Sequence, residues 1–287
     1  MKKLLAAFLC CIMVISLSSC GYSEAKQNEI ISMFDSFDKS QNCVILTEKL
    51  LVVRDTQYNL SEIQYNDKRC NIVLLEEDGF YAYTFDREEL SVEFLFTYYE
   101  SFESVLLGTE TVPSNVINGF FADNCFWFRM NDPKTDEFNQ IYYAWNVDTH
   151  QITIVDTDDL PQDFEYAKDN NRSKEYSFSY NSKVWNRSID VTDNNTKITK
   201  TIDKSVLNTF EEGQKISRMR HMTLFDVAHV FERDGDVYFA SFFEVGPLGD
   251  PCYYYVVKWN YETEECDFYT SFYFEEFQDH IYDMYIF

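Results

Sequence analysis

The chain has 287 residues, with 24 Lys and Arg against 49 Asp and Glu, which gives a formal net charge of −25 at pH 7. A surface that acidic repels nucleic acid, anionic lipid headgroups and anionic wall polymers, so DNA or RNA is not expected as a partner unless a local basic patch overrides the charge. Aromatic residues make up 18% of the chain and there are only 8 glycines, which favours β-strands joined by turns built from Asn and Asp.

The first segment has the pattern of an export signal. Lys2 and Lys3 precede an apolar stretch, residues 4–17, that contains no charge. The stretch is shorter than the roughly 20 apolar residues that span a bilayer. It ends in Leu17-Ser18-Ser19-Cys20, which resembles the lipobox of bacterial lipoproteins. The resemblance implies cleavage before Cys20 and attachment of a diacylglycerol to its thiol. An ordinary signal peptide with a chance cysteine near its cleavage site is the alternative.

The lipobox also predicts an organisation and an address. Residues 1–19 would be the signal peptide, residues 20–28 a polar lipidated tether, and residues 29–287 a single all-β domain. Two acyl chains anchor a protein stably without a transmembrane helix. We therefore expect the chain on the extracytoplasmic side of the cell membrane, lipid-anchored at Cys20.

Two kinds of periodicity follow the tether. Apolar residues recur at helical spacing and predict a short amphipathic helix, carried by Ile30, Ile31, Phe34 and Phe37. From residue 42 onward the pattern is that of strands. Residues 91–98 alternate, with polar residues on one face and Val92, Phe94, Phe96 and Tyr98 on the other. Residues 236–243 and 253–257 are nearly continuous in apolar residues, which is typical of strands buried on both faces.

An internal repeat organises the second half of the chain. Trp145-Asn146-Val147-Asp148-Thr149 recurs as Trp259-Asn260-Tyr261-Glu262-Thr263. Upstream, each copy has an apolar strand and then an Asp-Pro loop, Asp132-Pro133 in the first and Asp250-Pro251 in the second. Each copy therefore predicts a strand, a loop, a second strand, a polar turn and a third strand. The matching positions of Trp145 and Trp259 indicate packing.

Weaker copies of the polar turn lie near residues 55, 101 and 193, beside those near 148 and 262. A period of ~40–50 residues with about four strands is that of a β-propeller blade. We predict an all-β, β-propeller-like fold with five four-stranded blades, or six if the long last interval hides another turn. Residues 281–287 would pair with strands near residues 42–54 and so remove an exposed sheet edge. A large β-sandwich with similar hairpins is the alternative.

The long interval contains an insertion at residues 203–222. It predicts a short helix with Gly213 at its end and one apolar side made by Val206, Leu207 and Phe210. The insertion also carries the only basic cluster of the chain, Lys215, Arg218, Arg220 and His221. Pairing with acidic neighbours is the preferred interpretation, and docking of an acidic partner is the alternative.

Five cysteines remain once the signal is removed and Cys20 is acylated: Cys43, Cys70, Cys125, Cys252 and Cys266. An odd number cannot all pair. The hairpin around Glu262 places Cys266 opposite Trp259, too far from Cys252 for a bridge. We expect buried free thiols, with room for one disulfide among the others.

No catalytic, nucleotide-binding or zinc motif is present, so no cofactor and no enzymatic activity are expected. Four histidines, including His150 in a predicted surface turn, lack ligand spacing. Two acidic runs, residues 156–159 and 190–195, contain oxygen ligands for calcium but do not fit the EF-hand spacing. They are interpreted as solvated turns.

The functional hypothesis is a non-enzymatic binding module for an envelope protein, a peptide or a glycan. In a propeller, residues 131–139 and 245–251 would lie as neighbours on one face, which nominates Asp132, Pro133, Asp250 and Pro251 as ligand-face residues. Trp127 and Trp185 are the candidate exposed aromatic residues, although packing in the core is the preferred interpretation for both. The alternative is a glycan hydrolase, which needs two carboxylates about 5–10 Å apart in the central funnel.

Overall fold

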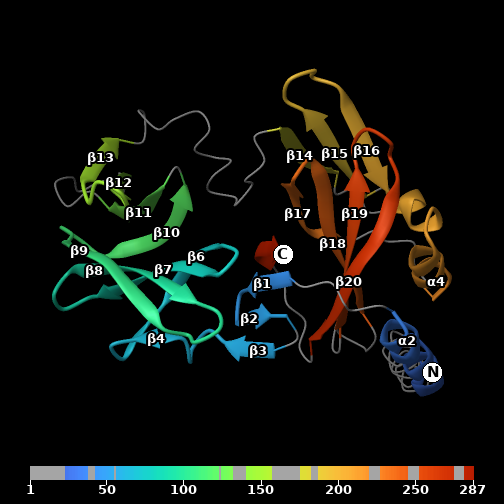
Figure 1. Ribbon diagram of the computed structural model, residues 1–287, viewed down its shortest axis with the longest axis horizontal. Coiled ribbons are helices and arrows are strands. Elements are labelled where there is room, and N and C mark those ends of the chain that lie inside the picture. The colour runs from blue at the N-terminus through green and yellow to red at the C-terminus, as the bar shows by residue number, and fades with distance from the viewer. Residues whose placement is uncertain are drawn as a thin grey trace, which may run out of the picture. The chain divides into compact units, whose positions relative to one another are not determined.

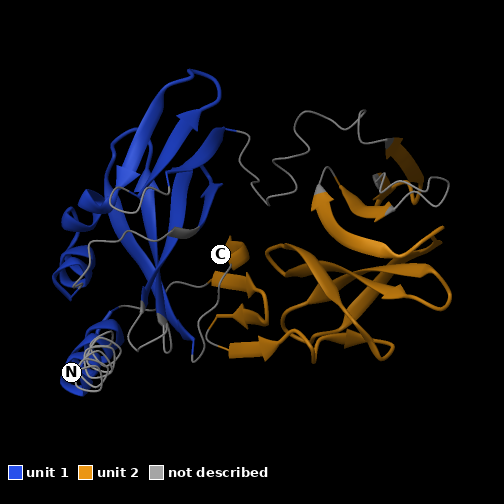
Figure 2. Ribbon diagram, turned by 180° about the vertical axis from the view of Figure 1, so that it is seen from behind, with its two compact units in different colours: residues 1–41, 173–279 blue, residues 42–172, 280–287 orange. Residues whose placement is uncertain are grey.

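The computed structural model describes residues 23–37, 43–54, 56–122, 124–131, 140–156, 175–181, 187–219, 227–244, 252–274 and 281–287. The chain divides into two compact units (Figure 2). We call residues 1–41 with 173–279 unit 1, and residues 42–172 with 280–287 unit 2. In the described ranges, no helix is both long and apolar enough to cross a membrane.

Unit 2 contains three four-stranded antiparallel sheets and a small hairpin (Figure 1). The closing sheet has the order β21 (Ile281–Ile286), β1 (Cys43–Thr47), β2 (Leu50–Val53), β3 (Thr56–Asn59). The second sheet is β6 (Asn71–Leu75), β7 (Gly79–Asp86), β8 (Ser91–Tyr98), β9 (Ser104–Thr111). The third is β10 (Val116–Ala122), β11 (Cys125–Asn131), β12 (Gln140–Asn146), β13 (Ile152–Asp156). The hairpin is β4 (Gln64–Tyr65) with β5 (Lys68–Arg69).

Unit 1 contains two antiparallel sheets and the helices. The three-stranded sheet is β14 (Tyr176–Asn181), β15 (Ser188–Asp193), β16 (Thr199–Asp203). The four-stranded sheet is β17 (Val227–Arg233), β18 (Asp236–Glu244), β19 (Cys252–Asn260), β20 (Cys266–Phe274). The helices are α2 (Glu24–Asp35), the 3₁₀ helix η2 (Lys204–Asn208) and α4 (Glu211–Met219).

The predicted all-β, propeller-like class is confirmed by the topology of the sheets. The described strands form separate sheets of three or four strands, consecutive in the chain except where β21 joins β1, whereas a sandwich would join them into two large sheets. Five such sheets occur in the described part of the chain, apart from the small hairpin. The predicted closure is also confirmed, because β21 pairs with β1 from Cys43 opposite Ile286 to Leu46 opposite Asp283.

The repeated turns have one local design. Asn146 and Asn260 each accept hydrogen bonds through Oδ1 from the backbone N–H groups two and three residues later, at 2.9–3.1 Å. Asp193 accepts the equivalent pair at 2.7 and 3.1 Å. Asn and Asp favour such turns because their short side chains replace a backbone acceptor. The turns lie between the third and fourth strands of their sheets, as do the predicted turns near residues 55 and 101; the Asp193 sheet is three-stranded, and there the turn joins its last two strands.

Strand β8 is buried on both sides, which corrects the expectation of a polar face. Val92 and Phe94 belong to the core shared with the third sheet, while Leu95 belongs to the core shared with the closing sheet. Thr97 is buried and Tyr98 is 43% exposed. The reason is that the second sheet of unit 2 has a neighbour on each face, so alternation no longer separates core from solvent.

Helix α2 covers the core of unit 1. Its apolar side is buried, and Phe34 stacks on Tyr253 with ring centroids 4.4 Å apart. The helix begins at Glu24, where the Ser23 hydroxyl caps it, so the residues expected as the end of the tether form its first turns. The predicted burial of β18 and β19 is confirmed, since Phe239 of β18 and Val256 and Val257 of β19 are fully buried.

The insertion forms η2 and α4, and the predicted burial of Val206, Leu207 and Phe210 is confirmed. Gly213 lies inside α4 and not at a helix end. A Cβ there would lie 2.3 Å from the carbonyl oxygen of Leu207 and 2.6 Å from the ring of Phe210. Glycine is therefore needed for close packing rather than for stopping a helix.

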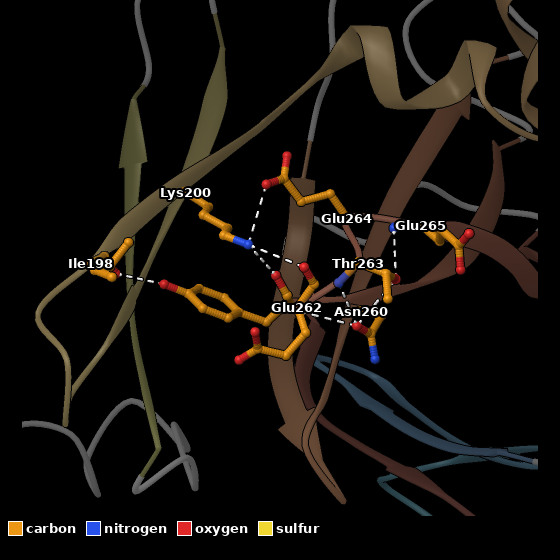
Figure 3. Close-up of polar contacts among 8 residues, drawn as sticks. Ile198, Lys200, Asn260, Glu262, Thr263, Glu264 and Glu265 are labelled. Atoms are coloured by element: carbon orange, nitrogen blue, oxygen red, sulfur yellow. Dashed lines mark hydrogen bonds and ion pairs between the residues drawn. The ribbon is translucent and has the colours of Figure 1, made fainter.

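A lysine joins the two sheets of unit 1 (Figure 3). From β16, the Lys200 ammonium donates to the backbone carbonyls of Tyr261 and Glu262 at 2.6 and 3.4 Å. It also pairs with Glu264 at 3.2 Å and lies 4.7 Å from the centroid of the Tyr261 ring. The Tyr261 hydroxyl donates back to the Ile198 carbonyl at 2.8 Å. The Asn260 turn is thereby held against the neighbouring sheet.

A buried carboxylate has the corresponding place in unit 2. Asp283 of β21 is 2% exposed, and its Oδ2 accepts the backbone N–H of Leu75 at 2.9 Å. Its Oδ1 accepts the N–H of Met284 at 2.9 Å. Leu75 is in β6, so this side chain links the closing sheet to the second sheet.

The cysteine predictions are confirmed where the residues are described. Cys43, Cys70 and Cys266 are buried free thiols and Cys125 is a half-buried one. Trp259 lies opposite Cys266 in the β19–β20 register. Burial raises the pKa of Cys43 to about 12, so this thiol is held in its unreactive protonated form. The two repeat tryptophans, Trp145 and Trp259, are 1% and 3% exposed, which confirms their packing role.

Candidate functional site

The first strand of each sheet of unit 2 has a β-bulge. The registers skip Val73 in β6, Ile117 in β10 and Tyr282 in β21. The same irregularity occurs in unit 1, where β17 skips Ala228. Bulges bend a strand and redirect a side chain, and they are frequent next to binding sites.

The three bulges of unit 2 meet at one cleft, since β6 lies beside both β10 and β21. Its volume is about 850 Å³. We call it the first-strand groove and define it by residues 46–49, 59–61, 69–73 and 117–120 together with Tyr83 and Tyr282. Ile117 and Tyr282 are 45% and 46% exposed, so two of the three bulged side chains are open to solvent.

The charges of the groove differ from those of the chain. Its lining contains Lys49 and Arg69 as cations and Glu48 as an anion, whereas acids outnumber bases by 49 to 24 overall. Lys68, beside Arg69 in the hairpin, is paired with Asp86 at 3.2 Å and with Glu93 at 3.5 Å. No described acidic side chain forms an ion pair with Arg69, which is exposed.

The floor of the groove is tyrosine packed against glycine. Tyr83 is 7% exposed, and burial raises the pKa of its hydroxyl to about 12, so the group remains a hydrogen-bond donor at neutral pH. A Cβ at Gly119 would lie 2.5 Å from Cε1 of Tyr83, so only glycine allows this approach. The Asn71 amide donates to the Tyr83 carbonyl at 3.3 Å. Asn71 and the exposed Asn118 add polar side chains to the lining.

Most site residues nominated from the sequence lie outside the described residues. These are Cys20, Asp132, Pro133, Trp185, Asp250 and Pro251. Trp127 of β11 is described, and it is half-buried rather than fully exposed. Its ring stacks on Phe120 with centroids 6.1 Å apart. Phe120 lines the groove and is paired with Trp127 in the β10–β11 register, so Trp127 packs beside a residue of the groove wall.

The other nominated features have local structural roles where they are described. Asp190 accepts the Thr201 hydroxyl at 2.6 Å and Asp193 holds its turn. No cluster of three or more candidate metal ligands occurs among the described residues. Lys215 of the basic cluster pairs with Glu211 at 2.8 Å, as preferred from the sequence. His150 is exposed in its turn, as expected.

Sequence reasoning missed the groove itself. Arg69 and Asn71 are close in the chain, but Asn118 and Tyr282 come from strands far from them, and the four residues have no common motif. Near each of these residues, polar residues interrupt an alternating apolar pattern. The same interruption occurs elsewhere in the chain, so it could not have identified the groove.

No known protein family matches the chain, and no curated protein matches it. Three solved structures show a distant likeness. TolB from Acinetobacter baumannii is 7% identical with a TM-score of 0.30, and the alignment covers 82% of this chain and 54% of that one. The WD40 domain of SCAP from fission yeast is 9% identical with a TM-score of 0.23, over 85% and 60% of the two chains. A chain of the nidogen/laminin complex is 8% identical with a TM-score of 0.30, over 86% and 98%.

The chain thus spans about half the length of the TolB structure and three fifths of the SCAP domain. Likeness of this degree identifies no family and no function.

Proposed function

We propose that this chain is a lipid-anchored, extracytoplasmic binding module that holds its ligand in the first-strand groove. The anchor would be a diacylglycerol on Cys20, following the lipobox resemblance. The body would have no enzymatic activity and would bind an envelope protein, a peptide or a glycan. Nucleic acid is not proposed, because the chain carries a formal charge of −25.

The observation that supports binding is the construction of the groove. Ligand sites are concave, with apolar walls and a few polar groups that fix orientation. The groove combines Ile72, Ile117 and Phe120 with the cation Arg69 and the amide Asn118. It lies between β6 and β10, which are edge strands of packed sheets, and the sheets hold their side chains in fixed places.

The hydrolase alternative is not favoured by the groove. A glycosidase needs two carboxylates about 5–10 Å apart. Among the described residues that line the groove, Glu48 is the single acid.

Capture of a ligand from envelope extracts tests the proposal. The bait should be residues 23–287, because Ser23 caps α2 and a later start would remove the cap and part of the first turn of that helix. Ile117→Trp should narrow the groove and reduce capture at least about tenfold, since it places a bulky side chain where the ligand would lie. Ile154→Trp is the matched control, because Ile154 is 61% exposed on β13 of the same sheet and does not line the groove. Equal capture by the three proteins would contradict the assignment of the groove.

The anchor needs its own test. Cys20→Ala should abolish labelling by a fatty-acid analogue and release the chain from membranes. Labelling that persists in Cys20→Ala would refute the lipobox assignment, whatever the groove binds.

A further inference from the structure

The charge distribution around the first-strand groove narrows the ligand class. In a chain with twice as many acids as bases, most cations are expected to have an acidic partner. Lys26, Lys68 and Lys258 follow this rule, with partners at 2.6–3.2 Å. Arg69 does not, since no ion pair to it occurs within the described ranges. Its guanidinium lines a cleft where the two cations Lys49 and Arg69 outnumber the single acid Glu48.

The groups around Arg69 include several hydrogen-bond donors. Lys49 contributes an ammonium and Asn118 an amide, while the Asn71 amide donates to the Tyr83 carbonyl. The buried Tyr83 hydroxyl remains protonated at neutral pH. Donors that surround a guanidinium complement a carboxylate, which is acceptor-only and can accept both arms of the arginine fork.

The edges of the groove fit an extended chain. β6 and β10 are each the terminal strand of their sheet, so half of their backbone N–H and C=O groups have no strand partner on the outer side. A peptide can use such an edge for main-chain hydrogen bonds, while apolar residues such as Ile72 and Ile117 contact its side chains. A glycan would lack the main-chain complement.

We propose that the first-strand groove binds an extended peptide bearing a carboxylate, with Arg69 as the principal anion contact and Lys49 as the secondary one. The proposal rests on the proposed function and adds the class of ligand to it. The carboxylate can be a glutamate or aspartate side chain or a free C-terminus, because the same fork recognises all three.

Isothermal titration of the full chain in mild detergent tests the proposal with triglutamate as the probe. Triglutamine with both ends blocked is its counterpart without a carboxylate, and trigalacturonic acid carries three carboxylates on a sugar. Triglutamate should bind at least about tenfold more tightly than either of the others. Arg69→Gln should weaken the binding of triglutamate about tenfold or more, and Lys49→Gln should weaken it about two- to fivefold.

Arg87→Gln is the matched control. Arg87 is an exposed arginine of the same unit that does not line the groove, so its loss should leave the affinity unchanged. Triglutamate binding that is insensitive to Arg69→Gln, or no tighter than triglutamine binding, would overturn the proposal. Tighter binding of trigalacturonic acid than of triglutamate would indicate an acidic glycan as the ligand and would also overturn the proposal. If Ile117→Trp blocks triglutamate binding but Arg69→Gln does not weaken it, the proposed function stands and only this inference is removed.

Discussion

Within each unit a charged side chain links one sheet to the next, and the charge has opposite sign in the two units. In unit 2 the link is Asp283, a carboxylate that is 2% exposed and accepts the N–H of Leu75. In unit 1 the link is Lys200, whose side chain is 24% exposed and donates to two carbonyls of a turn. A buried charge depends on every partner it has, whereas a partly solvated charge can exchange a partner for water. The two links should therefore differ in cost when broken, although they occupy similar places.

Asp283→Ala should have the largest effect. It leaves the fully buried N–H of Leu75 without its acceptor, and we expect the free energy of unfolding to fall by about 3 kcal/mol. Asp283→Asn keeps one acceptor oxygen and should lose about half as much. Urea unfolding measures both. Equal stability of Asp283→Ala and the unchanged chain would show that the buried link is not needed.

Lys200→Met should have a smaller effect, about 1 kcal/mol, because methionine keeps the aliphatic packing and water replaces part of the lost hydrogen bonding. Added salt should reduce the difference between the two proteins, since the Glu264 pair is partly exposed. Lys204→Met is the control, because Lys204 is exposed on η2. A loss as large as that of Asp283→Ala would remove the contrast between the units.

The two copies of the repeated turn sharpen the comparison further. Asn146→Asp should be tolerated within about 0.5 kcal/mol, because the Asn146 amide donates to a thiol, that of Cys125. Asn260→Asp should cost about 1 kcal/mol, because the Asn260 amide donates to the Asp236 carboxylate at 3.0 Å and a second carboxylate would be repelled. Thermal unfolding of the two variants and of the unchanged chain measures the two effects. Identical shifts would show that the copies are energetically alike.

The smallest effect is expected at Asp193 and depends on pH. Hydrogen bonds from the N–H groups of Thr196 and Asn195 lower the pKa of this carboxyl below its ordinary value of 3.8. Because the folded pKa is the lower one, its contribution to stability is present above the unfolded pKa and is lost as pH falls through the folded pKa. Asp193→Asn should make the acid limb of the stability curve shallower. NMR titration would refute the account if this carboxyl titrated at or above 3.8.

Much of the fold was predictable because its signals are local. The Asn and Asp turns, the paired tryptophans and the apolar C-terminal strand can each be recognised within a few residues, and they led to the sheet topology and the β21–β1 closure. Gly213 was misread because a packing role and a capping role look the same in sequence. The face of β8 was misread because alternation does not reveal a second neighbouring sheet.

The candidate site was not predictable for a different reason. A bulge such as that at Ile117 or Tyr282 has no sequence signature, since it is defined by the register with another strand. Arg69 looks like any exposed arginine until the positions of β6 and β10 show that it lines a cleft. The ligand-face loops nominated from the sequence, residues 131–139 and 245–251, depended on blade geometry alone.

Hydrogen exchange of the chain with and without its captured ligand tests the central claim most directly. Ligand in the first-strand groove should slow exchange at the backbone N–H groups of Ile72, Val73, Ile117 and Asn118, and should leave the turns after Asn146 and Asn260 unchanged. Protection confined to residues 131–139 and 245–251, with none in β6 and β10, would contradict the account and return the binding face to those loops.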